Sequence, residues 1–95
     1  MADFCITDVR YNDDKSHITF VKVREEKQGK VGAPRTVSRA FVADLIRLGK
    51  VTFQTRTKTN ERWQRGAAVY LIDDEYLTTE RNDTKRDNLG ELPTF

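Results

Sequence analysis

Residues 38–50, SRAFVADLIRLGK, carry the clearest helix pattern in the 95-residue chain and decide its fold. Ser38 is a good N-cap residue, because its hydroxyl can accept a hydrogen bond from an otherwise unpaired N–H of the first turn. Gly49 can adopt the left-handed backbone that ends a helix. The apolar side chains repeat at helical spacing and are Phe41, Val42, Leu45, Ile46 and Leu48. We therefore expect a helix over residues 39–48 that packs this stripe on a sheet.

The segments around this helix alternate with the period of two that is typical of strands. The expected strands are residues 5–11, 17–25, 51–58, 62–72 and 76–79. The polar turn at residues 12–16 joins the first two into an antiparallel hairpin, and residues 59–61 join the next two. Gly66 lies inside the fourth strand, where a glycine indicates a bulge or a kink.

Two further segments show no period. Residues 25–36 are rich in turn residues and predict a loop of about a dozen residues. Residues 81–95 predict an irregular C-terminal tail, either packed on the domain or used as a docking segment. The element order ββαβββ predicts an α+β fold, with a small antiparallel sheet and one helix on one face, in a single domain over residues 1–80.

The composition limits the class of protein. Hydrophobic residues make up 37% of the chain and charged residues 34%, which predicts a thin core under a charged surface. No apolar run reaches the roughly 20 residues of a membrane span, and the start of the chain lacks a signal-peptide pattern. Cys5 is the only cysteine, so no internal disulfide can form. We expect a cytoplasmic protein with no membrane association, either monomeric or weakly homodimeric.

The net charge of +2 hides an uneven distribution of charge along the chain. Residues 1–21 carry a net charge of −2, residues 22–65 carry +8, and residues 66–95 carry −4. The middle of the chain is therefore basic and both ends are acidic. A charge map with two signs favours binding to a charged partner.

Several segments resemble a known family. The quoted stretches are residues 76–79 (YLTT), 82–84 (NDT) and 87–93 (DNLGELP). They are similar to the ending of a family of short bacterial proteins known only as a domain of unknown function, thirty-eight ninety-two. The helix at residues 38–50 is similar to the central helix of that family. The resemblance implies a small bacterial or phage-borne domain and assigns no catalytic residue.

No set of residues has the spacing of a catalytic or metal site. His17 is the only histidine, and with Cys5 it supplies two ligands where zinc needs three or four. The glycines around Lys30 match neither phosphate-binding loop pattern, and the acids at residues 73–75 lack the spacing of a calcium loop. We therefore expect no metal, no cofactor and no enzyme activity.

The basic hairpin is the strongest candidate for a binding site. Its residues are Arg56, Lys58, Arg62, Trp63 and Arg65, and Lys27, Lys30 and Arg35 of the predicted loop could extend the patch. Cations on a β-ribbon suit a phosphate backbone, and an aromatic ring can stack on a base. The same patch could instead bind a protein partner, or it could be a charged edge that prevents sheet-to-sheet association.

The tail offers a second candidate for docking. Leu89, Leu92 and Phe95 are spaced three apart among acidic residues. The segment could lie on the basic face of its own domain with its charges paired. Alternatively, it could be a free docking peptide.

Three functions follow from these features. The first is a small non-catalytic accessory module, encoded by a phage or mobile element, that binds a protein partner through the hairpin and the tail. The alternative is direct nucleic-acid binding by the basic hairpin. The third is an enzyme of unrecognised type, for which the sequence supplies no set of acid, base and nucleophile.

Overall fold

The computed structural model describes residues 2–14, 17–28, 30–72, 76–79 and 92–95. Its elements are β1 (Phe4–Tyr11), β2 (Ile18–Lys27), β3 (Lys30–Val31), β4 (Arg35–Ser38), α1 (Arg39–Arg47), β5 (Phe53–Thr59), β6 (Arg62–Ala68), β7 (Tyr70–Ile72) and β8 (Tyr76–Thr78). The described chain therefore has three more strands than the sequence predicts. No helix in these segments is long and apolar enough to cross a membrane.

The described strands form one large sheet and one separate pair. The large sheet has the order β3-β2-β1-β5-β6, with β4 also on the outer edge of β2, and β7 pairs with β8. Its pairs are antiparallel except that β1 and β5 are parallel, at residues 4–6 and 53–55. The fold is mostly sheet with one helix, as the α+β class predicts, but the sheet is mixed rather than antiparallel. The connection through α1 carries the chain back across one face of the sheet, so β5 runs in the same direction as β1.

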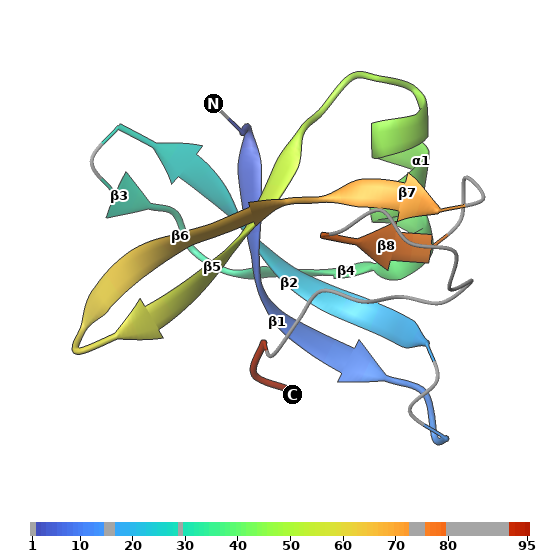
Figure 1. Ribbon diagram of the computed structural model, residues 1–95, viewed down its shortest axis with the longest axis horizontal. Helices are drawn as coiled ribbons and strands as arrows, with labels where there is room; N and C mark the ends of the chain where they lie inside the picture. The colour runs from blue at the N-terminus through green and yellow to red at the C-terminus, as the bar shows by residue number, and fades with distance from the viewer. Residues whose placement is uncertain (1, 15–16, 29, 73–75, 80–91) are drawn as a thin grey trace.

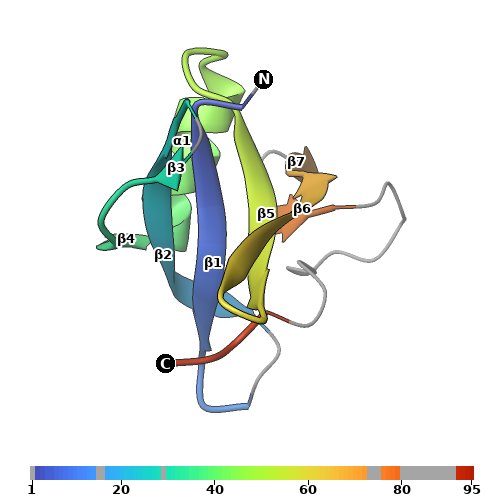
Figure 2. The same cartoon turned by 90° about the vertical axis from the view of Figure 1, so that its left-hand side faces the viewer.

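The hydrophobic core lies on the face of the sheet that α1 covers. Its buried side chains are Ile6, Val9, Ile18, Val21, Val23, Val42, Phe53, Val69, Leu77 and Leu92. The helix and the β7–β8 pair lie on one side of the molecule, and the hairpins β2–β3 and β5–β6 extend to the other side (Figure 1). Seen from the hairpin side, β1 runs through the centre of the sheet with α1 behind it (Figure 2).

The helix begins and ends within one residue of the predicted positions. The hydroxyl of Ser38 accepts a hydrogen bond from the N–H of Phe41 at 3.1 Å, and Gly49 follows the last turn with φ of +69°. The predicted apolar stripe is wrong in part, because Phe41 is 51% exposed and Leu48 is 64% exposed. The contacts of α1 with β2, β4, β7 and β8 cover the side that carries Val42 and leave these two side chains open.

The predicted loop over residues 25–36 is wrong. β2 continues to Lys27, and β3 and β4 return along its outer edge, with Val21 opposite Val37. These added strands are only two and four residues long, too short to show a period of two in the sequence. They satisfy backbone groups that the edge of β2 would otherwise leave unpaired.

The hairpin of β5 and β6 turns at Asn60 and Glu61. Their φ angles are 50° and 65°, which are typical of the type I′ turn that suits a twisted hairpin. The bulge predicted at Gly66 is confirmed by a register shift in the β5–β6 pairing. A Cβ at Gly66 would lie 2.1 Å from Thr55 Oγ1, so the close approach requires glycine. The predicted strand over residues 62–72 is split into β6 and β7.

Residues 92–95 close the outer edge of β1. The N–H of Val9 donates to the Pro93 carbonyl at 2.9 Å, and the N–H of Phe95 donates to the Val9 carbonyl at 3.0 Å. Leu92 is buried in the core. The first half of β1 pairs with β5 along this same edge. β5 and residues 92–95, which are distant in sequence, therefore share one edge of β1.

The other predictions have mixed outcomes. The first hairpin is confirmed by the antiparallel pairing of β1 and β2, and in its turn Asn12 Oδ1 accepts from the N–H of His17 at 3.2 Å. The last predicted strand is present as β8. The acidic turn at residues 73–75 and the part of the tail at residues 80–91 lie outside the described residues.

Candidate functional site

The face of the sheet opposite the core, which we call the open face, carries charged side chains. Arg24 lies opposite Cys5, and Cys5 lies opposite Gln54, so the three side chains share this face. Cys5 and Thr7 are fully or almost fully buried. The long side chains of the neighbouring strands therefore cover the centre of β1.

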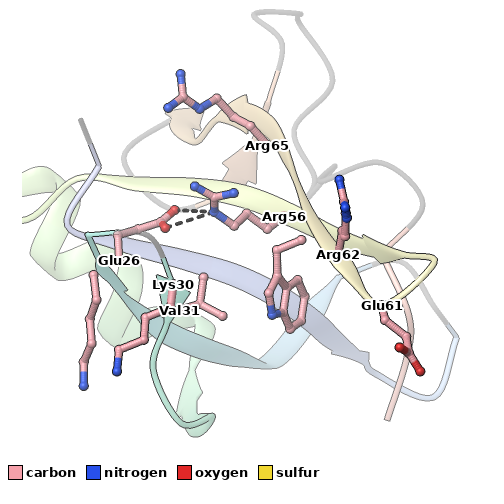
Figure 3. Close-up of a pocket in the computed structure, with 9 residues that line it drawn as sticks. Glu26, Lys30, Val31, Arg56, Glu61, Arg62 and Arg65 are labelled. Carbon is pink, nitrogen blue, oxygen red and sulfur yellow. Dashed lines mark hydrogen bonds and ion pairs between the residues drawn. The ribbon is translucent and has the colours of Figure 1, made fainter.

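A cleft of about 500 Å³ lies between the β2–β3 hairpin and the β5–β6 hairpin (Figure 3). Its lining residues are Glu26, Lys27, Lys30, Val31, Arg56, Glu61, Arg62, Trp63 and Arg65. Because five of these nine side chains are cationic and two are anionic, we call it the cationic cleft. Arg56 points towards Glu26, whereas Arg62 points away from that pair (Figure 3).

Glu26 joins the two walls of the cationic cleft. Arg56 Nε donates to Glu26 Oε1 at 2.9 Å and to Oε2 at 2.7 Å, and Gln54 Nε2 also donates to Oε2. Burial alone would raise the pKa of Glu26, but the hydrogen bonds from Arg56 and Gln54 and the charge of Arg56 together hold this pKa below its usual value. The hydrogen bond with Glu26 likewise raises the pKa of Arg56. Both groups are therefore ionised at neutral pH and neutralise each other.

Arg24 makes a second contact between the walls. Its guanidinium carbon lies 5.0 Å from the centroid of the Trp63 ring, and its Nη1 donates to the Gly32 carbonyl at 3.0 Å. Lys58 Nζ lies 5.5 Å from the centroid of the same ring. Cation–π contacts of this kind contribute about 0.5–2 kcal/mol each. Trp63 is therefore held in position by two cations.

Cys5 lies beneath this charged layer and is not an activated nucleophile. Burial raises the pKa of its thiol to about 11, and the negative charge of Glu26 acts in the same direction. The positive charges of Arg56 and Arg24 lower this pKa but do not outweigh the two opposing effects. The thiol is therefore protonated at neutral pH.

Comparison with known families covers almost the whole chain. Residues 5–93 match a family described as a protein of unknown function, DUF3892. The chain belongs to the DUF3892 family. The family predicted from the tail and the helix is thereby confirmed, and all residues that line the cationic cleft lie within the matched range. No curated protein and no solved structure matches the chain.

In this DUF3892 chain, most of the predicted basic residues come together. The cationic cleft is lined by Lys27, Lys30, Arg56, Arg62, Trp63 and Arg65. Lys58 contacts the Trp63 ring from the neighbouring strand. Arg35 is exposed on β4 and does not line the cleft.

Two central residues of this DUF3892 site, Arg24 and Glu26, are absent from the predicted set. The sequence prediction ends the second strand at residue 25 and assigns Glu26 to a loop. The available signal is the alternation of Lys22, Arg24 and Glu26, which places all three on one face of a longer strand. That alternation predicts the position of Glu26 but not its partner, because Arg56 comes from a distant hairpin.

His17 and Cys5 do not share a site. Cys5 lies opposite Arg24, whereas His17 precedes the other end of β2 and stacks on Tyr76 with a ring-centroid distance of 4.8 Å. Within the segments that the structure describes, no three His, Cys, Asp or Glu side chains gather in a way that could hold a metal ion.

The described docking residues of the tail lie away from the cationic cleft. Leu92 is part of the core. Phe95 lies against Arg10 and Lys22, and neither tail residue lines the cleft. Leu89 lies outside the described residues.

Proposed function

We propose that this chain is a non-catalytic module that binds nucleic acid through the cationic cleft. The observation that carries the proposal is a group of four cleft cations that make no ion pair within the described segments. They are Lys27, Lys30, Arg62 and Arg65. Glu26 forms its ion pair with Arg56, although the charge of Arg65 also helps to lower the pKa of Glu26. With Glu61 also in the lining, the cationic cleft keeps an excess of three positive charges.

Phosphate groups are the ligands that suit these four side chains. Lys and Arg side chains that neutralise phosphates release condensed counterions, which favours binding at low salt. The guanidinium groups of Arg62 and Arg65 can each donate two parallel hydrogen bonds to a phosphate. Lys27 and Lys30 belong to the opposite hairpin, so the cations approach a polyanion from both hairpins.

The walls of the cleft are held together without a ligand. Glu26 with Arg56 and Arg24 with Trp63 each connect β2 to the β5–β6 hairpin. A ligand therefore meets a preorganised site, and less conformational entropy is lost when it binds. The Trp63 ring in the lining adds an apolar surface beside the cations.

A salt titration tests the proposal. Labelled single-stranded and duplex DNA and RNA are titrated at several salt concentrations, with fluorescence anisotropy as the readout. Neutralisation of phosphates by four cations predicts a log–log slope of about 3, at roughly 0.7–0.9 per phosphate. Lys30→Gln should reduce that slope by about 1, whereas Lys50→Gln, outside the cleft, should leave it unchanged.

Two results would overturn the proposal. One is the absence of binding to every nucleic acid at tens of micromolar protein and low salt. The other is an equal loss of binding in Lys30→Gln and Lys50→Gln, because this would assign binding to the net charge of the chain rather than to the cationic cleft.

A protein partner is the second candidate, and the exposed side chains of α1 favour it. Phe41 and Leu48 are seven positions apart, so they lie about two turns apart on the same side of the helix, and both are more than half exposed. Exposed aromatic and aliphatic side chains are common at the centres of protein interfaces. The test is affinity capture with the wild-type chain and with Phe41→Asp as bait. A partner that binds both baits equally would exclude this surface.

A further inference from the structure

A row of three side chains continues from the cleft along the open face. Phe20, Lys22 and Arg24 alternate along β2, so they share this face at intervals of roughly 6.6 Å. We call them the β2 row. Arg24 at one end contacts the Trp63 ring, which lines the cationic cleft. The β2 row therefore leads directly away from the cleft.

The Phe95 ring lies beside the middle of the β2 row. Arg10 and Lys22 lie 4.7 Å and 4.8 Å from its centroid. Arg10 Nε also donates to the main-chain oxygen of Phe95 at 2.9 Å, and the N–H of Phe95 bonds to the Val9 carbonyl. Both the backbone and the ring of Phe95 are therefore held on the open face.

Phe20 adds an open ring at the far end. It lies directly opposite Arg10 in the β1–β2 pairing and is 41% exposed, although it belongs to a central part of the sheet. In the β1–β2 pairing, the carboxylate of Asp8 lies opposite Lys22. Asp8 also accepts a hydrogen bond from the Thr7 hydroxyl. The middle and the far end of the β2 row together thus combine two aromatic rings, Phe95 and Phe20, with two cations, Lys22 and Arg10.

We infer that the β2 row extends the proposed nucleic-acid site and that its ligand is a single strand. This inference rests on the proposed function of the cationic cleft. In a duplex the faces of the bases are stacked on one another, whereas a single strand can place them on aromatic side chains. One strand then binds with its phosphates at the cleft cations and at Arg10 and Lys22, and with a base against Phe20.

The test compares oligothymidylates of two lengths, about four and about twelve nucleotides, within the range of single-strand site sizes. The longer probe should bind more tightly to the wild-type chain than the shorter probe or a duplex of equal length. Phe20→Ala should weaken binding of the longer probe by about 5- to 150-fold, which is the usual contribution of one stacked base. It should change binding of the shorter probe less than about twofold.

Phe41→Ala is the matched control, because Phe41 is another exposed phenylalanine, 51% against 41% for Phe20, and lies on the opposite side of the sheet. It should leave both probes unaffected. Lys22→Gln provides a second variant that keeps the ring of Phe20, and it should also reduce only the longer-probe affinity. Unfolding curves of each variant show that it is folded.

The outcomes separate this inference from the proposed function. Suppose that the wild type binds probes of both lengths, and that the Phe20→Ala and Lys22→Gln variants bind the longer probe as tightly as the wild type does. The β2 row is then not part of the site, and the cleft proposal stands. Preference for the duplex would also overturn the single-strand inference. If the wild type binds neither oligothymidylate but binds another nucleic acid in the salt titration, the single-strand inference fails and the cleft proposal stands. If it binds no nucleic acid at all, both proposals fail.

Discussion

Arg56 and Glu26, 30 positions apart in the sequence, form the ion pair that joins the two hairpins of the cationic cleft. The side chain of Glu26 is 4% exposed and that of Arg56 is 18% exposed. A second ion pair, between Arg47 and Asp44 of α1, has the same 2.7 Å distance, but its side chains are 47% and 54% exposed. The two pairs therefore differ in burial and not in length.

Replacement of Glu26 by glutamine should lower the free energy of unfolding by about 3 kcal/mol, because it leaves the mostly buried charge of Arg56 without a counterion. Asp44→Asn should change this free energy by less than about 0.5 kcal/mol, because water already solvates that pair. Urea unfolding of the two variants gives the comparison. Equal losses would contradict the assigned role of burial.

Acid should destabilise the chain through the same carboxylate. Because the folded-state pKa of Glu26 lies below the ordinary value of 4.5, its ionised form contributes stability at higher pH. That contribution is lost as the pH falls below 4.5 and through the folded-state pKa. Unfolding free energies measured across this range should fall less steeply for Glu26→Gln than for the wild type. Parallel curves would assign the acid sensitivity to other groups.

The thiol of Cys5 should react slowly with a thiol-specific reagent in the folded chain. Its pKa is raised from 9.0 to about 11, which lowers the thiolate fraction at pH 8 by about 100-fold. Burial reduces access further. Spectrophotometric thiol titration of the native chain, with the denatured chain as control, measures the difference. Similar rates in the two states would show that the charged layer over Cys5 opens readily.

Gly66→Ala should be more harmful than Gly32→Ala. A Cβ at Gly66 would meet Thr55 Oγ1 at 2.1 Å and the Thr55 carbonyl at 2.7 Å, whereas at Gly32 the nearest atoms are 3.5 Å away. We expect a loss of about 2 kcal/mol at Gly66, in the range of overpacked sites, and a small change at Gly32. Thermal or urea unfolding compares them. A stable Gly66→Ala variant would show that β5 and β6 can separate at the bulge.

Glu61→Gly should stabilise the β5–β6 hairpin. Glu61 has φ of 65°, a conformation that costs a residue with a Cβ about 1 kcal/mol or more and costs glycine much less. The resulting Asn-Gly pair is the preferred type I′ turn. We expect a gain of about 0.5–1 kcal/mol in unfolding free energy. Gln64→Gly, within β6, is the control and should be destabilising.

The features that could be predicted from the sequence depend on neighbouring residues. The hydroxyl of Ser38 and the bulge at Gly66 act within a few positions, and the helix and the bulge are found where these residues predict them. The exposure of Phe41 could not be predicted in this way. Which side of a helix is buried depends on the number and position of the strands beneath it, and β7 and β8 come later in the chain.

The candidate site was predictable in composition but not in arrangement. The basic residues of the second hairpin and Lys30 are visible as a charged run, and the structure places most of them around one cleft. The neutralisation of Arg56 by Glu26 depends on a contact between two hairpins. No local pattern specifies a contact of that range, so the sequence alone could not separate the paired cation from the unpaired ones.

The pairing of residues 92–95 with β1 also has a kinetic consequence. Arg10 and Phe95 are 85 positions apart in the sequence. Beside them, the backbone of Val9 is hydrogen-bonded to the Pro93 carbonyl and to the N–H of Phe95. Contacts at such separation are slow to form, because a long loop must close before they contribute any stability. During synthesis, the edge of β1 at Val9 therefore stays incomplete until Pro93 and Phe95 have left the ribosome.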